Sequence, residues 1–332
     1  MAKIWKDEDV SLDPIKDQTI AVLGYGIQGN AQSNNLKDSG LNVIVGLKEG
    51  GASWKKATDD GHKVMSISQA CKEADIIHIL IPDMVQAKVY REEIGPNVSE
   101  GNALAFSHAA AIHWEWIKAP DNVDVIMVAP KGPGSKVRET FLDGFGTPSI
   151  VAVHQDYTKT AWERTLGIAK GIGSTKAGVI QTTFQEEVET DWFGEQVDLC
   201  GGTASMIKNS FETLVEAGYQ PEIAYFEVLH EMKLIVDLVQ RYGIAGMYRR
   251  VSETARYGGL TRGPMVMDEH NKANMKKILA AIKDGTFNEE WVSDYEKNGK
   301  NAFDRFMKEL ESHQIEQVGK KMRLMMWPNS TE

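Results

Sequence analysis

Two pairs of acidic residues in the second half of the chain are spaced to act together: Asp191 with Glu195, and Glu227 with Glu231. Residues four apart in an α-helix lie on one face, so each pair would present two carboxylates side by side. Like charges at this spacing destabilise a helix, and a bound cation is one reason to keep them. Ligation by carboxylate oxygens alone favours Mg²⁺ or Mn²⁺ over zinc. A solvated acidic face explains the spacing equally well, because the chain has 47 acidic residues.

A glycine pattern near the start of the chain indicates a phosphate-binding turn. It follows an apolar run, Thr19–Leu23, and precedes a helical segment, Asn30–Lys37. In the pattern G-x-G-x-x-G the first glycine permits a tight turn, the second lets the backbone approach a pyrophosphate, and the third allows close helix packing. The helix N-terminus then faces the phosphates. A glycine turn required only by packing is the alternative. The predicted cofactor-binding residues here are Gly24, Tyr25, Gly26, Ile27, Gln28 and Gly29.

The loop after the next apolar run, Asn42–Gly46, is placed to meet the ribose of a dinucleotide. A 2′-phosphate requires a cation and hydroxyl groups, whereas a free 2′-hydroxyl requires a carboxylate. Lys48 and Ser53 meet the first requirement, and Glu49 could meet the second. We therefore expect use of NADPH and also of NADH, with a modest preference for NADPH. A solvated loop is the alternative for any one of these side chains.

These candidate residues require elements that position them, and the first half of the chain supplies β-rich runs. Several runs are apolar on both faces, which is typical of parallel strands covered by helices on each side. We predict an open, doubly wound α/β sheet of the Rossmann type over residues 1–182 and an all-helical domain over 183–328. In the second domain, Pro221–Tyr242 has helical spacing and Gly258–Pro264 is expected to be a loop. The predicted strands are Thr19–Leu23, Asn42–Gly46, Ile76–Ile81, Ala103–Ser107, Asp124–Ala129, Ser149–His154 and Gly178–Thr182.

Length and charge narrow the class of protein. A chain of 332 residues suggests two globular domains, and 37 basic against 47 acidic residues leave a net charge of −10. Nucleic acid and anionic membranes are therefore not expected partners. The longest apolar stretch, Ala74–Pro82, is too short to span a membrane, and Met1–Val10 does not resemble a signal peptide. Cys71 and Cys200 have no metal-ligand spacing, so we expect reduced thiols in a cytoplasmic protein.

The chain resembles the ketol-acid reductoisomerase (acetohydroxyacid isomeroreductase) family in its short form, class I. The similar motifs cover nearly the whole length in the family's order. They are Gly24–Gly29, Ala105–His108, Met127–Gly134, Thr190–Gln196, Phe226–Glu231 and Val251–Ala255.

The resemblance implies roles for matching positions. Asp191 and Glu195 would be ligands of a pair of Mg²⁺ ions, and Asp191 would bridge the two ions. Glu227 would bind the second of these ions, and Glu231 would bind the same ion or the substrate. His108 and Lys131 match polar residues beside the metals and the nicotinamide, although outside the family they would more often be a buried histidine and a surface lysine. The implied catalytic residues are His108, Lys131 and Glu231; the substrate-binding residues Ser252, Pro133 and Glu231; and further cofactor-binding residues Pro82, Asp83 and Gly134.

The family's reaction has two stages and belongs to the biosynthesis of valine, isoleucine and leucine. An alkyl group of a 2-hydroxy-2-alkyl-3-oxo acid, 2-acetolactate or 2-aceto-2-hydroxybutyrate, first migrates to the adjacent carbon. NAD(P)H then reduces the resulting 2-oxo acid to a 2,3-dihydroxy acid. The resemblance also implies a knotted helical domain and a homodimer with a shared active site, with larger assemblies possible.

Two alternatives remain at this level. A metal-independent two-domain hydroxyacid dehydrogenase, with Lys131 or Lys208 as its acid–base group, explains the glycine turn but not the acidic pairs. A non-catalytic nucleotide-sensing or scaffold protein could use the same fold. Five positions depart from the family pattern without affecting a metal ligand, and they bear on substrate fit: Asn30, Ala109, Arg256, Gly259 and Arg262.

Overall fold

The computed structural model describes residues 2–328 and divides into two compact units, Met1–Thr190 and Asp191–Glu332. The division falls inside helix α9 (Phe184–Gly194). Each unit is described by itself below.

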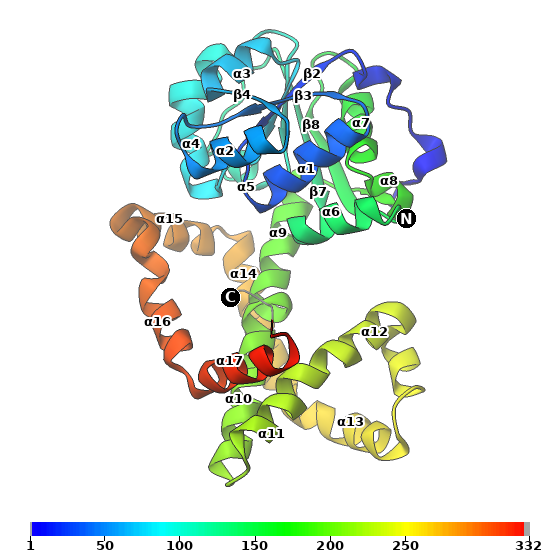
Figure 1. Ribbon diagram of the computed structural model, residues 1–332, viewed down its shortest axis with the longest axis vertical. Helices are drawn as coiled ribbons and strands as arrows, with labels where there is room; N and C mark the ends of the chain where they lie inside the picture. The colour runs from blue at the N-terminus through cyan, green and yellow to red at the C-terminus, as the bar shows by residue number, and fades with distance from the viewer. Residues whose placement is uncertain (1, 329–332) are drawn as a thin grey trace. The chain divides into compact units, whose positions relative to one another are not determined.

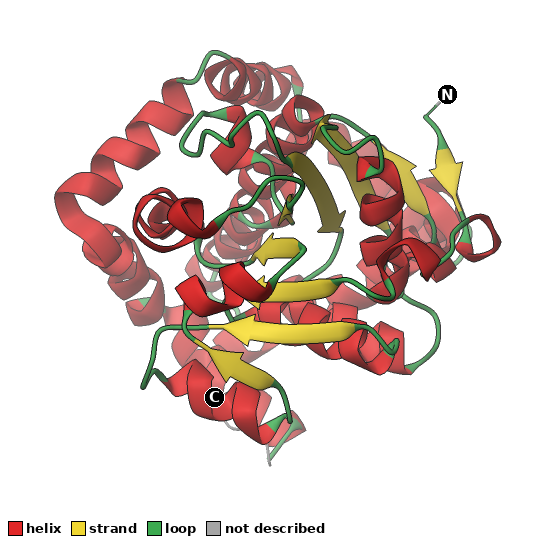
Figure 2. Ribbon diagram, turned by 90° about the horizontal axis from the view of Figure 1, so that it is seen from above, coloured by secondary structure: helices red, strands yellow, loops and turns green. Residues whose placement is uncertain are grey.

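The first unit is built on one nine-stranded sheet (Figures 1 and 2). The strand order is β1-β9-β8-β7-β6-β5-β2-β3-β4. From β4 to β7 the strands have the order of a dinucleotide-binding fold. The sequence order of the strands turns back between the neighbouring parallel strands β2 and β5. The strands are β1 (Ile4–Trp5), β2 (Thr19–Leu23), β3 (Asn42–Gly46), β4 (Lys63–Met65), β5 (Ile76–Ile79), β6 (Ala103–Phe106), β7 (Asp124–Pro130), β8 (Ser149–Gln155) and β9 (Val179–Gln181).

All seven predicted strands are present, so the predicted α/β fold is confirmed, with two corrections. Strands β1 and β4 were not predicted, because two or three residues are too few to show a period. The sheet is also mixed: β8 runs antiparallel to β7, and β1 antiparallel to β9. Chain direction at a sheet edge depends on the connection between strands, which apolar composition does not encode.

Helices surround this sheet, and apolar runs on both faces of its strands form the core. Side chains of β2, β5, β6 and β7 are buried along nearly their whole length. Helix α1 lies beside α6 and α7 (Figure 1). The α-helices are α1 (Ile27–Asp38), α2 (Ala52–Asp59), α3 (Ile67–Glu73), α4 (Asp83–Val89), α5 (Ala110–His113), α6 (Gly134–Leu142), α7 (Ala161–Gly171), α8 (Ser174–Ala177) and α9; shorter turns are η1 (Asp7–Asp9), η2 (Asp13–Ile15), η3 (Tyr90–Ile94) and η4 (Gly95–Asn97).

The second unit is mostly helical and contains no strand in the part that the structure describes, which confirms its predicted class. Its core is small: Phe211, Tyr225, Ile315 and Val318 are buried together with Ala224. Its elements are η5 (Glu195–Leu199), α10 (Gly201–Glu216), α11 (Pro221–Tyr225), η6 (Phe226–His230), α12 (Glu231–Tyr248), α13 (Glu253–Val266), α14 (Glu269–Lys283), α15 (Thr286–Asn298), η7 (Gly299–Phe303), α16 (Asp304–Ser312) and α17 (Gln314–Met326).

The prediction of a loop at Gly258–Pro264 is wrong, because these residues lie inside α13. Gly259 serves close packing: a Cβ there would approach the Tyr248 ring to 2.9 Å. Pro264 lies inside the last turn of this helix, where it cannot donate a backbone hydrogen bond, and the helix ends two residues later at Val266.

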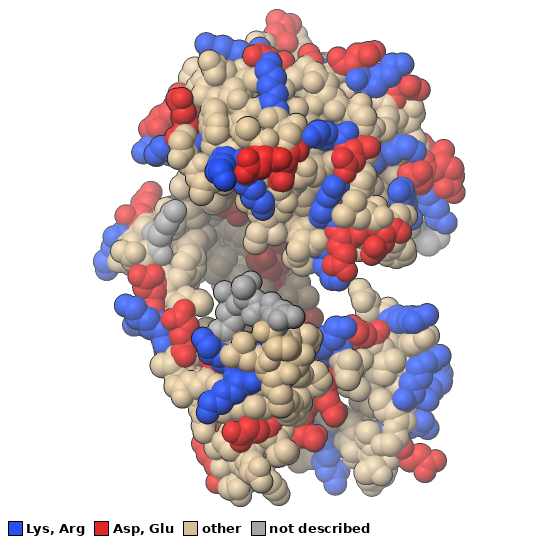
Figure 3. Space-filling view, viewed as in Figure 1, with Lys and Arg blue, Asp and Glu red and all other residues tan. Residues whose placement is uncertain are grey.

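Neither described unit contains a helix long and apolar enough to cross a membrane. On the face drawn in Figure 3, basic and acidic side chains are interspersed over the first unit. Both Cys71 and Cys200 are free, as expected from their spacing.

Candidate active site

The glycine turn between β2 and α1 has the geometry that a pyrophosphate requires. Gly24 has φ +100°, and a Cβ there would lie 2.7 Å from the carbonyl oxygen of Leu80. A Cβ on Gly29 would lie 2.2 Å from the Gly24 oxygen, so the third glycine is required for packing. A Cβ on Gly26 would meet no atom within 4 Å, and no side chain caps the helix that begins after it. The turn therefore leaves room for a phosphate against a helix N-terminus.

A second loop, at the end of β7, packs directly against this turn. The Gln28 side chain donates from Nε2 to the carbonyl oxygen of Gly132 at 3.0 Å. Gly134 opens α6, and a Cβ there would lie 2.2 Å from the Ile27 oxygen. The predicted cofactor residues Ile27 and Gln28 are thus neighbours of Gly134, although more than 100 residues separate them from it in sequence.

The predicted ribose loop forms a turn that exposes its charged side chains. The Gly51 amide donates to the Lys48 carbonyl at 3.3 Å, and Gly50 between them has φ +72°. Lys48 and Glu49 are both exposed, and Ser53 is half-buried in the first turn of α2. Both charged side chains are therefore open to solvent on this turn.

Pro82 and Asp83 follow β5 at the same edge of the sheet. Pro82 precedes the first residue of α4, and the Asp83 carboxylate accepts a hydrogen bond from Gln86 Nε2 at 2.9 Å. The amide of Leu80, two residues earlier, donates to the Leu23 carbonyl, so this segment adjoins the end of β2.

The buried carboxylate of Glu187 brings two of the predicted catalytic residues together. Its side chain is 1% exposed. Oε1 accepts from Lys131 Nζ at 3.0 Å, whereas Oε2 lies 3.1 Å from His108 Nδ1 and accepts from the Ala109 amide at 2.9 Å. Both oxygens are therefore occupied by donors, and the carboxylate fixes the loop after β6 and the loop after β7.

Opposing effects determine the pKa of Glu187. Burial raises the pKa of its carboxyl, but the hydrogen bond and charge of His108, the charge of Lys131 and the Ala109 amide outweigh burial and hold it below the usual value. Glu187 is thus an anion in the folded protein at neutral pH. Ala109, one of the departures from the family pattern, takes part through its backbone, which no side-chain change at this position removes.

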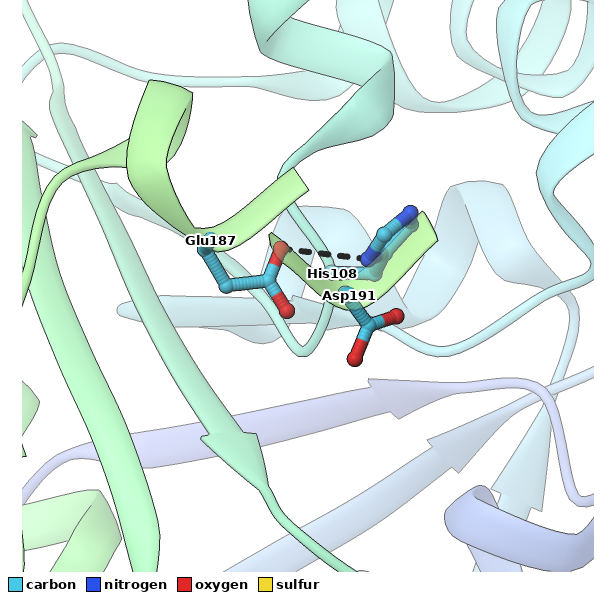
Figure 4. Close-up of side chains that lie close together, drawn as sticks. All are labelled: His108, Glu187 and Asp191. Atoms are coloured by element: carbon cyan, nitrogen blue, oxygen red, sulfur yellow. Dashed lines mark ion pairs between the residues drawn. The ribbon is translucent and has the colours of Figure 1, made fainter. Parts of the chain in front are cut away.

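Asp191 extends this cluster. It follows Glu187 by one turn of α9, and ligand atoms of His108, Glu187 and Asp191 all lie within 4.8 Å of one another (Figure 4). A carboxylate beside a buried anion is a donor set that suits a hard cation such as Mg²⁺. Asp191 is half-buried in this group, and its carboxylate is of the kind that binds such a cation.

The other predicted metal ligands are exposed and lie at π-helical turns. Glu195 begins η5, Glu227 lies in η6, and Glu231 immediately follows η6. Such turns are frequent at functional sites because they re-aim side chains within a helix. Among the described residues, the group of candidate ligand atoms around Asp191 does not include these three carboxylates.

Ser252, the predicted substrate-binding residue, precedes α13 as its N-cap. Its Oγ accepts from the Ala255 amide at 3.1 Å, which leaves the hydroxyl hydrogen available to a ligand. Arg256, a departure from the family pattern, donates from Nε to the Tyr248 carbonyl at 2.8 Å. Asn30, another departure, donates to Asp60 Oδ2 at 3.0 Å. These two substitutions therefore have structural partners.

Sequence reasoning did not assign Glu187, the residue at the centre of the cluster. One signal was available: Glu187, Asp191 and Glu195 repeat at intervals of four, so the acidic row on α9 begins one turn earlier than the predicted pair. Spacing could not show that this residue is buried or that it meets the two distant loops.

Three features define the class of protein. The order of the parallel strands turns back between β2 and β5, the glycine turn there is open to a phosphate, and a histidine–lysine–carboxylate cluster lies at the same edge of the sheet. This is the class of dinucleotide-dependent oxidoreductases, here with a helical second unit. Two family models match in succession: acetohydroxy acid isomeroreductase, NADPH-binding domain, over residues 14–178, and ketol-acid reductoisomerase, C-terminal domain, over 184–327. The chain belongs to the ketol-acid reductoisomerase family, whose enzymes act in branched-chain amino-acid biosynthesis.

Relatives of similar length support this assignment. A protein of Nitrosopumilus maritimus named ketol-acid reductoisomerase (NADP(+)) is 76% identical over 332 residues, 100% of both chains. One of Methanocaldococcus jannaschii with the same name is 58% identical over 327 residues, 98% of each chain. A solved structure, an NADH-preferring ketol-acid reductoisomerase from an uncultured archaeon, has a TM-score of 0.94 at 45% identity and covers 97% of this chain and 98% of its own.

Proposed function

We propose that the chain converts 2-acetolactate and 2-aceto-2-hydroxybutyrate to 2,3-dihydroxy acids by alkyl migration followed by reduction with NAD(P)H. Family membership supplies the reaction type. The structural observation that supports the proposal is the cluster of His108, Glu187 and Asp191, with Lys131 on the same buried carboxylate. A dehydrogenase that uses no metal would leave Asp191 and the carboxylates at the π-turns without a role.

Asp191, Glu195, Glu227 and Glu231 would hold two Mg²⁺ ions. Bound there, the ions supply Lewis-acid polarisation of adjacent substrate oxygens, and the nicotinamide supplies the hydride. The glycine turn would hold the pyrophosphate, because Gly26 leaves open space beside the N-terminus of α1, and Gly134 would allow the loop after β7 to pack against Ile27 at the same place.

Residues of the chain itself would orient the substrate and exchange protons with its oxygens. Glu187 accepts from His108 Nδ1, so the other ring nitrogen, which points away from Glu187 in Figure 4, is the one able to exchange a proton with a substrate oxygen. Lys131 brings a positive charge to the same place, where it can stabilise an oxygen anion. Ser252 can donate its hydroxyl hydrogen to a substrate carboxylate, and the ring of Pro133 can pack against the substrate's alkyl group.

The direct test is oxidation of NADPH and of NADH with each substrate, with and without Mg²⁺. We expect turnover of both substrates only when Mg²⁺ is present. Turnover that is unchanged after removal of divalent ions would support the metal-independent hydroxyacid dehydrogenase. No turnover with either cofactor and either substrate, together with nucleotide binding, would support a sensing protein.

The cofactor proposal is use of both nucleotides with a modest preference for NADPH. The curated relatives carry NADP(+) in their names, whereas the solved relative is described as NADH-preferring. In this chain the exposed Lys48 favours a 2′-phosphate, and Glu49 beside it favours a free 2′-hydroxyl.

We also propose a homodimer in which each site combines carboxylates of two chains. Asp191 and Glu195 of one chain would meet Glu227 of the partner subunit and Glu231 of the partner subunit. Support comes from Glu227 and Glu231, which are exposed and lie outside the group around Asp191 among residues 2–328. In a two-fold dimer the same surface is presented twice, so both sites can be completed in the same way. A knotted helical domain, a domain boundary after residue 182, larger assemblies and a cytoplasmic location belong to the same proposal.

Subunit complementation tests the shared site. Inactive Asp191→Asn and Glu231→Gln chains are refolded together, and activity is compared with each chain refolded alone. In a heterodimer with shared sites one site carries both lesions and the other carries neither, so activity should return. No recovery, with heterodimers demonstrated by differential tagging, would show that each site is built within one chain.

A further inference from the structure

The side chain of Gln32 is fully buried in α1, one turn after the glycine turn, and the proposed reaction does not use it. A buried amide must find partners for its donors and its oxygen. Nε2 of Gln32 donates to Gln28 Oε1 at 3.0 Å and to Ser107 Oγ at 3.0 Å. Its Oε1 lies 2.8 Å from His78 Nε2. Three segments of the first unit therefore meet at one amide.

Two of these partners lead to the proposed catalytic residues. Ser107 immediately precedes His108 in the loop after β6. Gln28 donates onward to the Gly132 carbonyl at 3.0 Å, and Gly132 immediately follows Lys131 in the loop after β7. The buried amide thus connects the helix behind the glycine turn to both loops that converge on Glu187.

The third partner, His78, provides a fixed anchor. It is fully buried in the middle of β5, and burial lowers its pKa to about 4. The ring is therefore neutral at physiological pH and can donate one N–H to the Gln32 oxygen. With His78 held in the sheet, the amide cannot turn without breaking several buried hydrogen bonds at once.

We propose that Gln32 is a positioning residue that holds the His108 and Lys131 loops in register with the cofactor-binding turn. This rests on the proposed function. The glycine turn is fixed separately, by the Gly24 amide, which donates to the Gly46 carbonyl at 3.1 Å. Loss of the amide should therefore displace the two loops and leave the phosphate-binding backbone in place.

The test is Gln32→Met, which keeps the side-chain length and removes the hydrogen bonds. We expect kcat to fall about tenfold, the scale of a small misplacement of reacting groups. The Kd for NADPH, measured by nicotinamide fluorescence without substrate or Mg²⁺, should change less than about twofold. Amide hydrogen exchange of residues 107–109 and 132–134 should become faster in the protein without ligands.

Asn35→Leu is the matched control. Asn35 lies on the same helix and is equally buried. It donates to the carbonyls of Val137 in α6 and of Ile172 after α7, each at 3.1 Å, and accepts from Arg138 Nη1 at 2.8 Å, so none of its partners lies in residues 107–109 or 132–134. This variant should lose thermal stability to a similar extent but keep kcat and the exchange rates at residues 107–109. Ser107→Ala is a second variant in case Gln32→Met does not fold; it should lower kcat about threefold and accelerate the same amides.

The inference is overturned if Gln32→Met keeps kcat within about twofold of wild type with unchanged exchange, or if Asn35→Leu loses as much activity. Failure of the proposed function would be seen instead in the wild-type protein, as absence of Mg²⁺-dependent NADPH oxidation. The exchange measurement needs no substrate, so the two failures can be told apart.

Discussion

The two units differ in how much of their apolar surface each buries by itself. In the first unit, every residue of β5 and β6 is buried. In the second, the long helices α12 and α13 contain one buried residue, Gly246. Large apolar side chains are exposed along these two helices, namely Leu234, Ile235, Val236, Tyr242, Ile244, Tyr257, Leu260, Met265 and Val266.

This difference indicates that the first unit is stable by itself, whereas the helical unit has apolar surface left to bury. A sheet covered by helices completes its own core, so the first unit can hold the glycine turn and the contacts of Glu187 with His108 and Lys131 by itself. An apolar helical surface of this extent is typical of a protein–protein interface. In our proposal the helical unit contributes carboxylates to the site and gains both its stability and its full ligand set from a second copy.

The largest effect is expected for a metal ligand of the helical unit. Asp191→Asn should lower turnover by about three orders of magnitude in both stages, because an amide cannot neutralise two cations. Turnover at increasing Mg²⁺ concentration measures it. Near-normal turnover at the usual Mg²⁺ level would remove Asp191 from the site.

In the first unit, the substitution to compare with Asp191→Asn is Glu187→Gln. An amide keeps the size but removes the charge that Lys131 and His108 share, so kcat should fall about 100-fold, corresponding to two charge-assisted hydrogen bonds. Cofactor affinity should remain, because the glycine turn does not contact Glu187. Glu186→Gln, an exposed neighbour on α9, is the control and should leave kcat unchanged. Equal losses in the two variants would contradict the role of Glu187.

The self-contained core of the first unit predicts a pH effect at His78. Its pKa falls from 6.5 to about 4 on folding because of burial, so the unfolded chain binds the proton first as the pH decreases. Stability should therefore decline between pH 6.5 and 4, by about 3 kcal/mol in total, and be unaffected by this group above that range. Denaturant unfolding of wild type and His78→Gln checks it. The same pH dependence in both proteins would disprove the assignment.

The apolar surface of the helical unit predicts a smaller effect on assembly. Ile244 in α12 and Phe145 in the first unit are both 67% exposed. Ile244→Asp should shift the sedimentation profile towards monomer and lower activity about tenfold at low protein concentration, whereas Phe145→Asp should change neither. If both substitutions act alike, exposed apolar area does not distinguish the two units.

The smallest effect concerns the rim of the cofactor site. Lys48→Ala should raise the KM for NADPH about tenfold, the equivalent of one charge-assisted bond, and leave the KM for NADH nearly unchanged. Lys55→Ala, an exposed lysine of α2 whose Nζ lies 3.6 Å from Asp59, is the control and should alter neither constant. Equal losses with the two cofactors would show that Lys48 does not contact the 2′-phosphate.

Local spacing determined much of this protein by itself. Thr19–Leu23, the glycine turn and the following helix lie where the pattern placed them, because a strand, a turn and a helix start are set by residues a few positions apart. The acidic residues Asp191 and Glu195 also lie in helical structure, as the spacing predicts. Asp191 lies in α9, and Glu195 is the first residue of the π-helical turn η5. These local motifs were specific enough to indicate the family.

Tertiary structure alone decided the contacts that make the site. Glu187 meets Lys131, 56 positions earlier, and the Ala109 amide, 78 positions earlier, and such pairs depend on how the sheet edge packs against α9. The antiparallel strand β8, the helical course of Gly258–Pro264 and the burial of Gln32 are decided in the same way. Sequence spacing encodes which residues share a face, whereas packing of distant segments determines which faces meet.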